Sequence, residues 1–430
     1  MDVLILHYHL NPGGVTRIIE SQIQSIHLND SSFPVKIVYG SSSATPELKN
    51  TDIVQTGLFN YVDNAVSGED LNKNLSDVLF LIRSCLKNST IVHSHNPNLG
   101  KNPALTVAMH KIASEGTPVV NHCHDFPEDR PANMQLLERV IPGMSTETVE
   151  RILYPRFQNY HYIVLNSCDY KRLLDKGILR RQIHLLPNPV PETKTAGINK
   201  GALREKVCSQ LKINSSEILC TYPVRAIERK NIGEFILMSV LFSETANFAI
   251  TLAPLNPVEI PAYERWKDFC RRNYLKIRFE AGERVNFKEL ISASDFCLTT
   301  SVREGFGMIY LEPWLLGTPV IGRELSCVIG DLKKQGLKFP RLYDKMEVPL
   351  GDRTQDFKDL SQDEQEIVIS EAVRNPQSRN KIKAANGFLS SWLNNIPGDV
   401  IENNQKIIRQ KFSLEEYGKQ ILGIYSEISR

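Results

Sequence analysis

Short apolar runs alternate with longer segments of helical periodicity along the chain, and this alternation constrains the fold more than any other feature. The runs lack the polar alternation of half-exposed strands, so we expect strands buried on both faces of a parallel sheet. Before residue 190 the expected strands are 3–6, 35–39, 90–92, 118–120 and 162–165. After it they are 218–224, 248–253, 276–279, 296–299 and 319–321.

Segments with apolar residues at helical spacing lie between these strands. A strand, a helix and a further strand in this order predict a right-handed βαβ unit. Because the pattern runs twice, we expect an α/β protein with two doubly wound, Rossmann-like domains. Three prolines within residues 187–191 predict the join, since proline is excluded from helix interiors and central strands. The expected domains are therefore 1–190 and 191–410, and the clearest expected helices are 16–27, 75–86, 104–113 and 234–241.

The composition is that of an ordinary globular protein. The 430 residues are 41% hydrophobic and 23% charged, which excludes a disordered or low-complexity chain. A net charge of +2 gives no electrostatic argument for nucleic acid as a partner. Residues 3–6 are too short for a signal-peptide core, and the longest apolar stretch, 235–242, is too short to span a bilayer. Since the eight cysteines show no CxxC spacing, we expect a reduced, cytoplasmic protein without an integral membrane segment.

The histidines are unevenly distributed, since all ten lie at or before His184. Residues two apart share one face of a strand, and parallel strands end at one edge of a sheet. Histidines at the ends of expected strands should therefore lie together. Two functional readings stay open: a divalent-metal site, or a polar wall that hydrogen-bonds a ligand rich in hydroxyl groups. Six histidines form three such His-x-His pairs: His7/His9, His93/His95 and His122/His124.

Ligands of open α/β sheets bind at the carboxyl ends of the strands, so loops that follow strands are the expected sites. In the first domain, Gly13 and Gly14 follow a strand and precede a helix, where the backbone can approach an anion. In the second domain, Arg225, Arg229 and Lys230 follow a strand and suit a diphosphate. We therefore expect an anionic ligand at these edges.

A second loop of the same domain carries two glutamates around a Gly-x-Gly sequence, at residues 301–312. The loop is expected to open a helix whose N–H groups and dipole face a phosphate. Glu304 in the loop would accept hydrogen bonds from sugar hydroxyls. Glu312, about two turns along that helix, would bind a vicinal diol such as ribose.

Taken in their order along the chain, these motifs resemble the retaining, nucleotide-sugar-dependent glycosyltransferases of family 4, which have the GT-B fold. The final residues are similar to that family's terminal helix, so the resemblance implies that 411–430 crosses back onto the first domain. Residues 323–351 do not follow the family pattern. The resembling segments are 13–14, 124–125, 186–190, 225–230, 301–321 and 412–425.

The resemblance implies an enzyme that moves a hexose from a nucleoside-diphosphate sugar to a hydroxyl group. Retention is usually explained by front-face attack, in which the leaving phosphate takes the acceptor proton and neither a metal nor a cofactor is needed. The absence of Asp-x-Asp from the sequence agrees with this. Implied catalytic residues are His124, Arg225, Lys230 and Glu304. Implied donor-binding residues are Gly13, Gly14, Arg225, Lys230, Ser301, Glu304, Gly305, Phe306, Gly307, Met308 and Glu312.

The acceptor is expected to be small and polar, either acidic or a sugar, and its expected contacts are Asn96, Lys101, Asp125 and Arg130. Lys101 and Arg130 would attract an acidic or phosphorylated acceptor. One rival is a metal-dependent hydrolase that uses the His-x-His pairs. Another is a GT-B protein that epimerises or only binds sugar nucleotides. The nucleotide base, the sugar, the linkage and the oligomeric state stay open.

Overall fold

The chain folds into two compact units. The first comprises Met1–Pro191 and Gln410–Arg430, and the second comprises Glu192–Arg409. Their boundaries lie within one residue of those expected from the sequence. The computed structural model describes residues 1–43, 48–62, 68–129, 131–140, 145–192 and 199–429.

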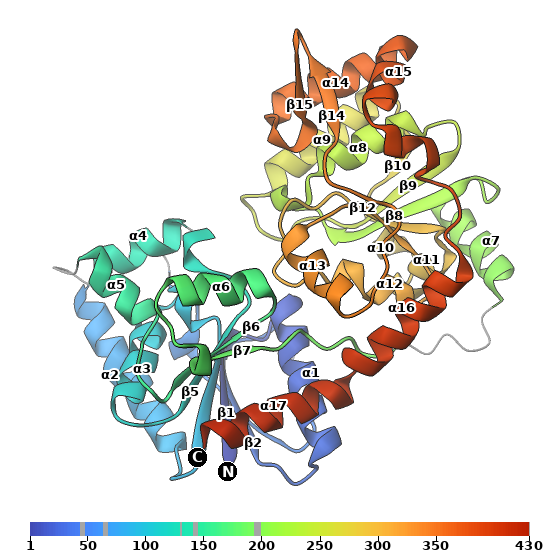
Figure 1. The fold of residues 1–430 in the computed structure, drawn as a ribbon. Coiled ribbons are helices and arrows are strands. Elements are labelled where there is room, and N and C mark those ends of the chain that lie inside the picture. The colour runs from blue at the N-terminus through green and yellow to red at the C-terminus, as the bar shows by residue number, and fades with distance from the viewer. Residues whose placement is uncertain (44–47, 63–67, 130, 141–144, 193–198, 430) are drawn as a thin grey trace. The chain divides into compact units, whose positions relative to one another are not determined.

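The first unit contains a seven-stranded parallel sheet with the strand order β3-β2-β1-β4-β5-β6-β7 (Figure 1). All five expected strands are present. The sequence prediction missed β3 and β7, which lie at the two edges of the sheet and lack a long apolar run. The strands are β1 (Asp2–His9), β2 (Val35–Ser41), β3 (Thr51–Gln55), β4 (Thr90–His95), β5 (Val119–Cys123), β6 (Tyr160–Val164) and β7 (Ile183–Leu185).

Helices cover both faces of this sheet because its strands are apolar on both sides. Leu4 and Leu6 of β1 belong to one core, with side chains of α2 (Gly68–Cys85), α3 (Pro103–Ser114), α4 (Pro131–Val140) and α5 (Thr146–Leu153). Ile5 points the opposite way, into a core formed with α1 (Gly14–Asn29) and α17 (Leu414–Ile428). A further helix, α6 (Ser167–Asp175), precedes β7.

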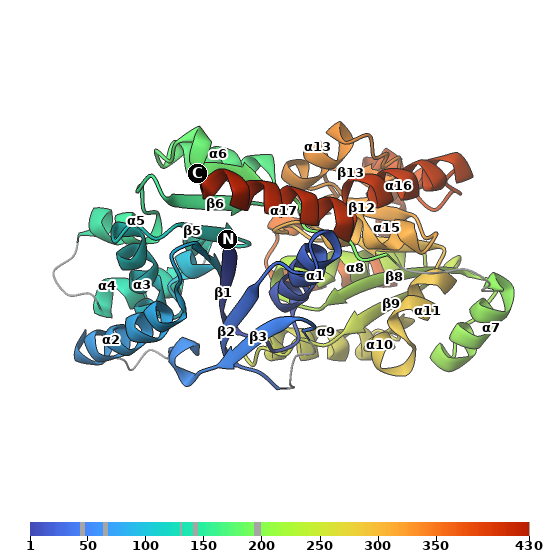
Figure 2. The same ribbon diagram turned by 90° about the horizontal axis from the view of Figure 1, so that it is seen from below.

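The C-terminal helix α17 packs directly on α1, and the two lie side by side in Figure 2. A Cβ on Gly418 would lie 2.2 Å from the backbone oxygen of Ser25, so only glycine allows this close approach. Tyr425 of α17 lies in the core below the sheet, where its hydroxyl contacts His93. The last helix is therefore a structural part of the first unit.

The second unit contains a six-stranded parallel sheet with the order β10-β9-β8-β11-β12-β13, together with a separate antiparallel hairpin, β14–β15. All five expected strands are present, and the short strands after residue 340 were missed. The strands are β8 (Ile218–Arg225), β9 (Ala246–Leu252), β10 (Ile277–Arg278), β11 (Phe296–Thr299), β12 (Val320–Arg323), β13 (Leu342–Tyr343), β14 (Glu347–Leu350) and β15 (Arg353–Asp356).

One face of this sheet packs on α7, α10 and α11. The helix expected at 234–241 is present as α8, and every residue of it is buried, including Glu234. No helix of the described part of the chain is both long and apolar enough to cross a membrane. The helices are α7 (Lys200–Leu211), α8 (Ile232–Leu241), α9 (Ile260–Arg272), α10 (Ala281–Arg284), α11 (Phe287–Ala293), α12 (Glu312–Leu315), α13 (Ser326–Lys334), α14 (Gln362–Arg374), α15 (Pro376–Ala385) and α16 (Gly398–Lys411).

Both sheets reverse their strand order beside the first strand of the unit. In the first unit the reversal falls between β1 and β4, and in the second between β8 and β11. Doubly wound sheets bind ligands at such switch points, beyond the carboxyl ends of the strands. The expected histidines and the expected cations lie at these two places.

Candidate functional site

A buried ionic cluster lies at the switch point of the second unit. The loop after β8 supplies Arg229 and Lys230, and the loop after β11 supplies Ser301 and Glu304. Lys230 Nζ forms an ion pair with Glu304 Oε1, and Arg229 Nη1 lies 3.0 Å from Glu304 Oε2. Ser301 Oγ donates to Glu304 Oε1 at 2.7 Å. Three polar side chains from two loops thus converge on the Glu304 carboxylate.

The protonation of this cluster follows from burial and charge. Burial, the largest influence, raises the pKa of Glu304, but the charges of Lys230 and Arg229 lower it by more, so the net pKa lies below its ordinary value. Burial lowers the pKa of Lys230, and Glu304 offsets part of that change. Only 7% of the Glu304 side chain and 11% of the Lys230 side chain are exposed. The pair is a preformed, mostly desolvated charge site.

Two buried hydroxyls hold the backbone that carries Lys230, and the sequence prediction missed both. Tyr222 Oη lies 3.0 Å from the carbonyl oxygen of Lys230 and 2.7 Å from Ser301 Oγ. Thr300 Oγ1 donates to the same carbonyl at 3.0 Å. Tyr222 lies inside an apolar strand and Thr300 follows the end of another, so nothing in the sequence marks either of them as part of a site.

Arg225 stands at the carboxyl end of β8, half-buried, and its Nη1 donates to the carbonyl oxygen of Ala253 at 2.8 Å. Burial lowers its pKa. No carboxylate among the described residues forms an ion pair with it, in contrast to Lys230. Arg225 therefore keeps guanidinium N–H groups for an anion, which suits its expected role at a diphosphate.

The Gly-x-Gly loop departs from the prediction. It is followed by a 3-10 helix of three residues, Met308–Tyr310, and then by the four-residue α12, of which Glu312 is the first residue. The expected helix that opens at the loop, with Glu312 two turns along, is therefore wrong. Gly307 adopts φ 80°, and a Cβ there would lie 2.8 Å from Tyr310 Cδ2, so the chain turns too sharply to continue a helix.

Because no long helix begins at this loop, a helix dipole does not favour an anion there. The positive charges of the ionic cluster, Arg229 and Lys230, are what can attract an anion to the loop. Pro313 fits because it occupies the first turn of α12, where its missing N–H costs nothing. Glu312 is half-buried, and Gly305 and Phe306 belong to the same turn.

A second buried cluster in this unit was not foreseen. It is centred on Arg323, the first residue of the segment 323–351 that departs from the family pattern. Arg323 Nη2 lies 2.6 Å from Glu234 Oε2 and 2.7 Å from Asp356 Oδ1, and the Arg323 side chain is 2% exposed. Burial lowers the pKa of Arg323, but the two carboxylates raise it by more. Asn231, which follows Lys230 directly and adopts φ 50°, donates to Glu234 Oε2 at 2.9 Å. The core cluster thus fixes the residue next to the expected diphosphate-binding lysine.

At the switch point of the first unit the side chains are imidazoles. Five histidines there are at most 7% exposed. Burial lowers the pKa of His7 and of His93 to about 3, and it lowers the pKa of the other three well below the ordinary value. All five are therefore neutral at pH 7. The five are His7, His93, His95, His122 and His124, whereas His9 is half-buried and contacts Tyr61 Oη at 3.0 Å.

The imidazoles hydrogen-bond to one another. His93 Nε2 lies 3.3 Å from His122 Nδ1, and His95 Nδ1 lies 2.8 Å from His124 Nε2. His7 Nδ1 lies 3.2 Å from the carbonyl oxygen of His95. The sequence prediction that the pairs lie together is thus met by contacts between neighbouring strands.

A metal site was one of the two readings of the histidines. Among the described residues, His93, His95 and His122 form a group whose potential ligand atoms lie within 4.8 Å of one another. The rings of His95 and His122 are stacked, however, as are those of His122 and His124, whose centroids are 4.2 Å apart. The His93 ring lies tilted to that of His95 and edge-on to that of His122. Neutral imidazoles can hydrogen-bond to one another or bind a metal. Both readings of the histidines therefore stay predictions.

The expected acceptor residues are only partly available. Asn96 is 3% exposed, and its Oδ1 accepts from the backbone N–H groups of His124 at 2.6 Å and Asp125 at 3.2 Å. Its side chain therefore supports the loop instead of facing an acceptor. Lys101 Nζ lies 4.1 Å from the centroid of the Tyr61 ring. Arg130 lies outside the described residues.

The glycines expected at the donor belong to the first unit. Gly13 precedes α1 and Gly14 begins it, as the motif predicts. A Cβ on Gly14 would meet no atom within 4 Å, so this loop places no internal packing demand on the residue. A ligand-binding role for the pair stays a prediction.

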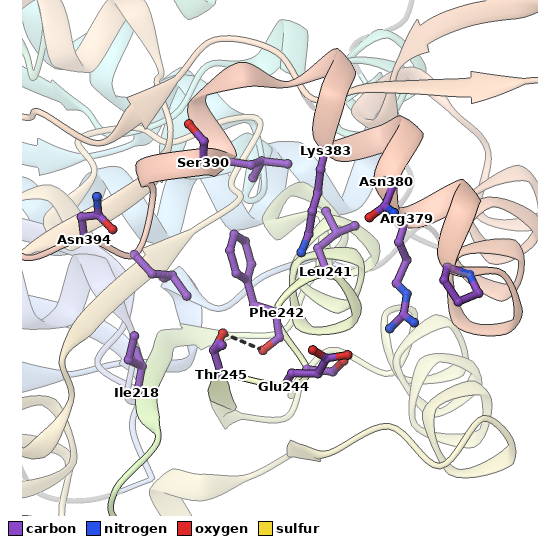
Figure 3. A pocket seen from close by; sticks show the side chains of 14 residues that line it. Ile218, Leu241, Phe242, Glu244, Thr245, Arg379, Asn380, Lys383, Ser390 and Asn394 are labelled. Carbon is purple, nitrogen blue, oxygen red and sulfur yellow. Dashed lines mark hydrogen bonds between the residues drawn. The ribbon is translucent and has the colours of Figure 1, made fainter.

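A cavity elsewhere in the second unit is lined by none of the residues expected to bind the donor or the acceptor. It has a volume of about 680 Å³ and is lined by Ile218, the first residue of β8, and by Arg379 and Lys383 of α15 (Figure 3). It therefore lies at the amino end of β8, whereas the ionic cluster lies at the carboxyl end. The two cations of this cavity, Arg379 and Lys383, therefore lie away from the ionic cluster and are suitable controls for substitutions there.

Comparisons with known proteins agree with the fold of two parallel sheets. A glycosyltransferase of Rickettsia africae superposes with a TM-score of 0.64 at 14% identity, covering 99% of this chain and 98% of that one. The Anabaena protein Alr3699/HepE, solved in complex with UDP and glucose, has a TM-score of 0.61 at 16% identity and covers 99% of both chains. The fold is therefore the GT-B fold of glycosyltransferases.

One relative is more similar in sequence than these solved structures. A mannosylglucosyl-3-phosphoglycerate synthase of Petrotoga mobilis is 27% identical over 394 residues, which are 87% of this chain and 75% of that enzyme. No family model matches the chain. The fold and this relative together indicate an enzyme of the glycosyltransferase class.

Proposed function

We propose that this protein is a retaining glycosyltransferase that moves a hexose from a nucleoside-diphosphate sugar to a hydroxyl group of a small, acidic acceptor. The observation that carries the proposal is the ionic cluster of Arg229, Lys230 and Glu304, together with Arg225 at the carboxyl end of β8. Cations suit the charge of a donor diphosphate, and a carboxylate beside them can accept hydrogen bonds from the hydroxyl groups of its sugar. The Anabaena neighbour, which was solved with UDP and glucose, supports a nucleotide sugar as donor.

In this proposal Arg225 and Lys230 bind the diphosphate and stabilise its charge as it leaves, which is the main catalytic demand of a front-face reaction. Glu304 accepts hydrogen bonds from the donor sugar, and Glu312 binds the ribose. Because Lys230 already contacts Glu304, the lysine is held in place before the donor arrives. The leaving phosphate takes the acceptor proton, and no metal or cofactor enters the scheme.

The acidic acceptor is supported by the name of the Petrotoga relative, whose product carries a phosphoglycerate group. Lys101 of the first unit would interact with that charge, together with Asp125 for a hydroxyl group. Asn96 is left out of the proposed acceptor contacts, since its side-chain oxygen is used by the loop.

The test is a panel of UDP-, GDP- and ADP-sugars with acidic acceptors (phosphorylated and unphosphorylated glycerate and glucosylglycerate) and neutral ones (glycerol and glucosylglycerol), with a metal chelator present. We expect release of nucleoside diphosphate only with one donor and an acidic acceptor, and NMR of the product should show the anomeric configuration of the donor. Hydrolysis or epimerisation of the donor without transfer would reject the proposal, and an inverted product would reject retention.

A substitution separates the ribose role of Glu312 from a general charge effect. Glu312→Gln should weaken binding of the free nucleoside diphosphate, measured by calorimetry, by about tenfold, since a hydrogen bond to a charged group contributes roughly 1.5 kcal/mol. The matched control is Glu324→Gln, whose carboxylate pairs with Lys333 at 2.8 Å. Equal affinities for the two variants would remove Glu312 from the site.

A further inference from the structure

The contact between His95 and His124 leaves the two rings with unequal surroundings. His95 is fully buried, its Nδ1 lies 2.8 Å from His124 Nε2, and its own Nε2 is buried without a hydrogen-bond partner among the described residues. His124 is 7% exposed, and its Nδ1 makes no hydrogen bond to a described residue. One end of this pair is therefore closed, and the other faces outward.

The protons of the pair follow from this asymmetry. A neutral imidazole carries one N–H donor and one lone pair, so the proton shared between the rings belongs to either His95 or His124. If it belonged to His124, His95 would carry its proton on Nε2, as an unpaired N–H in the core. Unpaired buried N–H groups are rarer than under-satisfied acceptors, because the donor has nowhere to turn. The other arrangement leaves only a lone pair unpaired.

We propose that His95 donates its Nδ1–H to His124 Nε2 and thereby holds His124 in the tautomer with its proton on Nδ1. His95 is then a positioning residue. His124 presents an N–H group outward and has no free lone pair, so it donates a hydrogen bond to a substrate oxygen and does not act as a base.

Two further contacts support this arrangement. Asn96 Oδ1 accepts from the backbone N–H of His124, so the main chain that carries the ring is fixed as well. Burial keeps the pKa of both histidines well below the ordinary value, so neither ring carries a second proton at pH 7. The oxygen that receives the hydrogen bond rests on the proposed function, whereas the tautomer itself does not.

The direct test is two-bond ¹H–¹⁵N NMR of the full chain labelled with ¹⁵N-histidine, with His124 assigned by its loss in His124→Gln. We expect His124 Nε2 to show the shift of an unprotonated nitrogen and Nδ1 that of a protonated one. The opposite pattern, with the proton on Nε2, would overturn the proposal. This readout needs no substrate, so it separates the tautomer from the proposed transferase activity.

Substitutions at His95 test the positioning role. In His95→Asn the amide nitrogen replaces Nδ1 as donor, and the tautomer of His124 should be kept. In His95→Leu the donor is lost, so the Nδ1–H signal should weaken and kcat should fall by about 10- to 100-fold, as for other partners that orient a histidine, with KM for the donor little changed. Equal kcat values for Asn and Leu at this position would contradict the positioning role.

The matched control is a second histidine pair of the same unit. His161 Nδ1 lies 3.1 Å from His184 Nε2, on β6 and β7. His161→Leu should change neither the His124 signals nor kcat. If the chain proves inactive with every donor but shows the expected tautomer, only the proposed function fails.

Discussion

The two units place opposite kinds of chemistry at the same topological position. In the second unit the loops after the strands carry Lys230, Glu304 and Arg229, which are charged and paired. In the first unit the corresponding strand ends carry five buried imidazoles that burial keeps neutral. One fold therefore supports an ionic edge and an uncharged edge.

The difference shows how burial sets the chemistry that each edge can offer. Lysine and glutamate stay charged in a desolvated loop because each is the other's counter-ion. Histidines have no counter-ion among themselves, so they lose their charge instead and hydrogen-bond as neutral rings. An ionic edge suits a diphosphate, and a neutral edge suits hydroxyl groups.

Acidification should produce a larger difference in stability between the two units than any single substitution. An unfolded histidine takes a proton near pH 6.5, whereas His7 and His93 in the fold do so only at about 3. Between these values the unfolded state binds more protons, so stability falls as the pH is lowered. At about pH 5 each fully buried histidine costs about 2 kcal/mol. Asp169, whose pKa burial raises to about 6, offsets only part of this.

Hydrogen exchange of peptides from each unit, compared at about pH 7.5 and about pH 5 after correction for intrinsic rates, measures the effect. The first unit should lose protection. The second should keep it, because the pKa values of Glu304 and Asp356 lie below their ordinary values and those carboxylates are protonated only at lower pH. If the second unit lost protection before the first, the histidines would not be the cause of the acid sensitivity.

Arg323→Met should give the largest loss from one substitution. It leaves Glu234 and Asp356 in the core without their cation, and breaking a buried pair in this way costs about 3–5 kcal/mol. Chemical denaturation monitored by fluorescence measures the loss. Arg353→Met removes an exposed pair with Glu364 and should leave the midpoint unchanged. Similar midpoints for the two variants would show that the buried cluster contributes little.

The fold was predictable because its central strands are apolar runs, and β1, β8 and β11 were all anticipated. The missed strands are short or lie at edges; β3, for example, contains Asp52 and has no apolar run. Such strands are defined by their neighbours and not by their own composition.

The site was predictable only where residues follow directly after a strand, as Lys230 and Glu304 do. The cluster of Arg323, Glu234 and Asp356 joins three distant segments, and no spacing in one sequence announces such a contact. Asn96 was placed among the acceptor contacts because its polarity was visible and its inward turn was not. The sharp turn at Gly307 likewise overrode the helix expected there.

Lys230→Ala tests whether the ionic edge acts on the donor. Loss of one charge that stabilises a leaving group costs about 10²- to 10³-fold in kcat, so a fall of this size is expected in the transferase assay. Lys383→Ala is the control, since Lys383 belongs to the same unit and lies over the Phe242 ring at the cavity of Figure 3. A comparable fall in both variants would point to general electrostatics and not to a site.

The smallest effect concerns the far end of the neutral network, where Tyr425 Oη lies 2.8 Å from His93 Nδ1 and accepts from Gln22 Nε2 at 2.9 Å. Tyr425→Phe removes these contacts and should lower the free energy of unfolding by about 1 kcal/mol, with kcat unchanged. Tyr417 lies on the same helix, but its buried hydroxyl has no partner among the described residues, so Tyr417→Phe should be neutral or stabilising in urea unfolding. If both variants lose the same stability, the hydroxyl of Tyr425 contributes only packing, and the neutral network ends at His93.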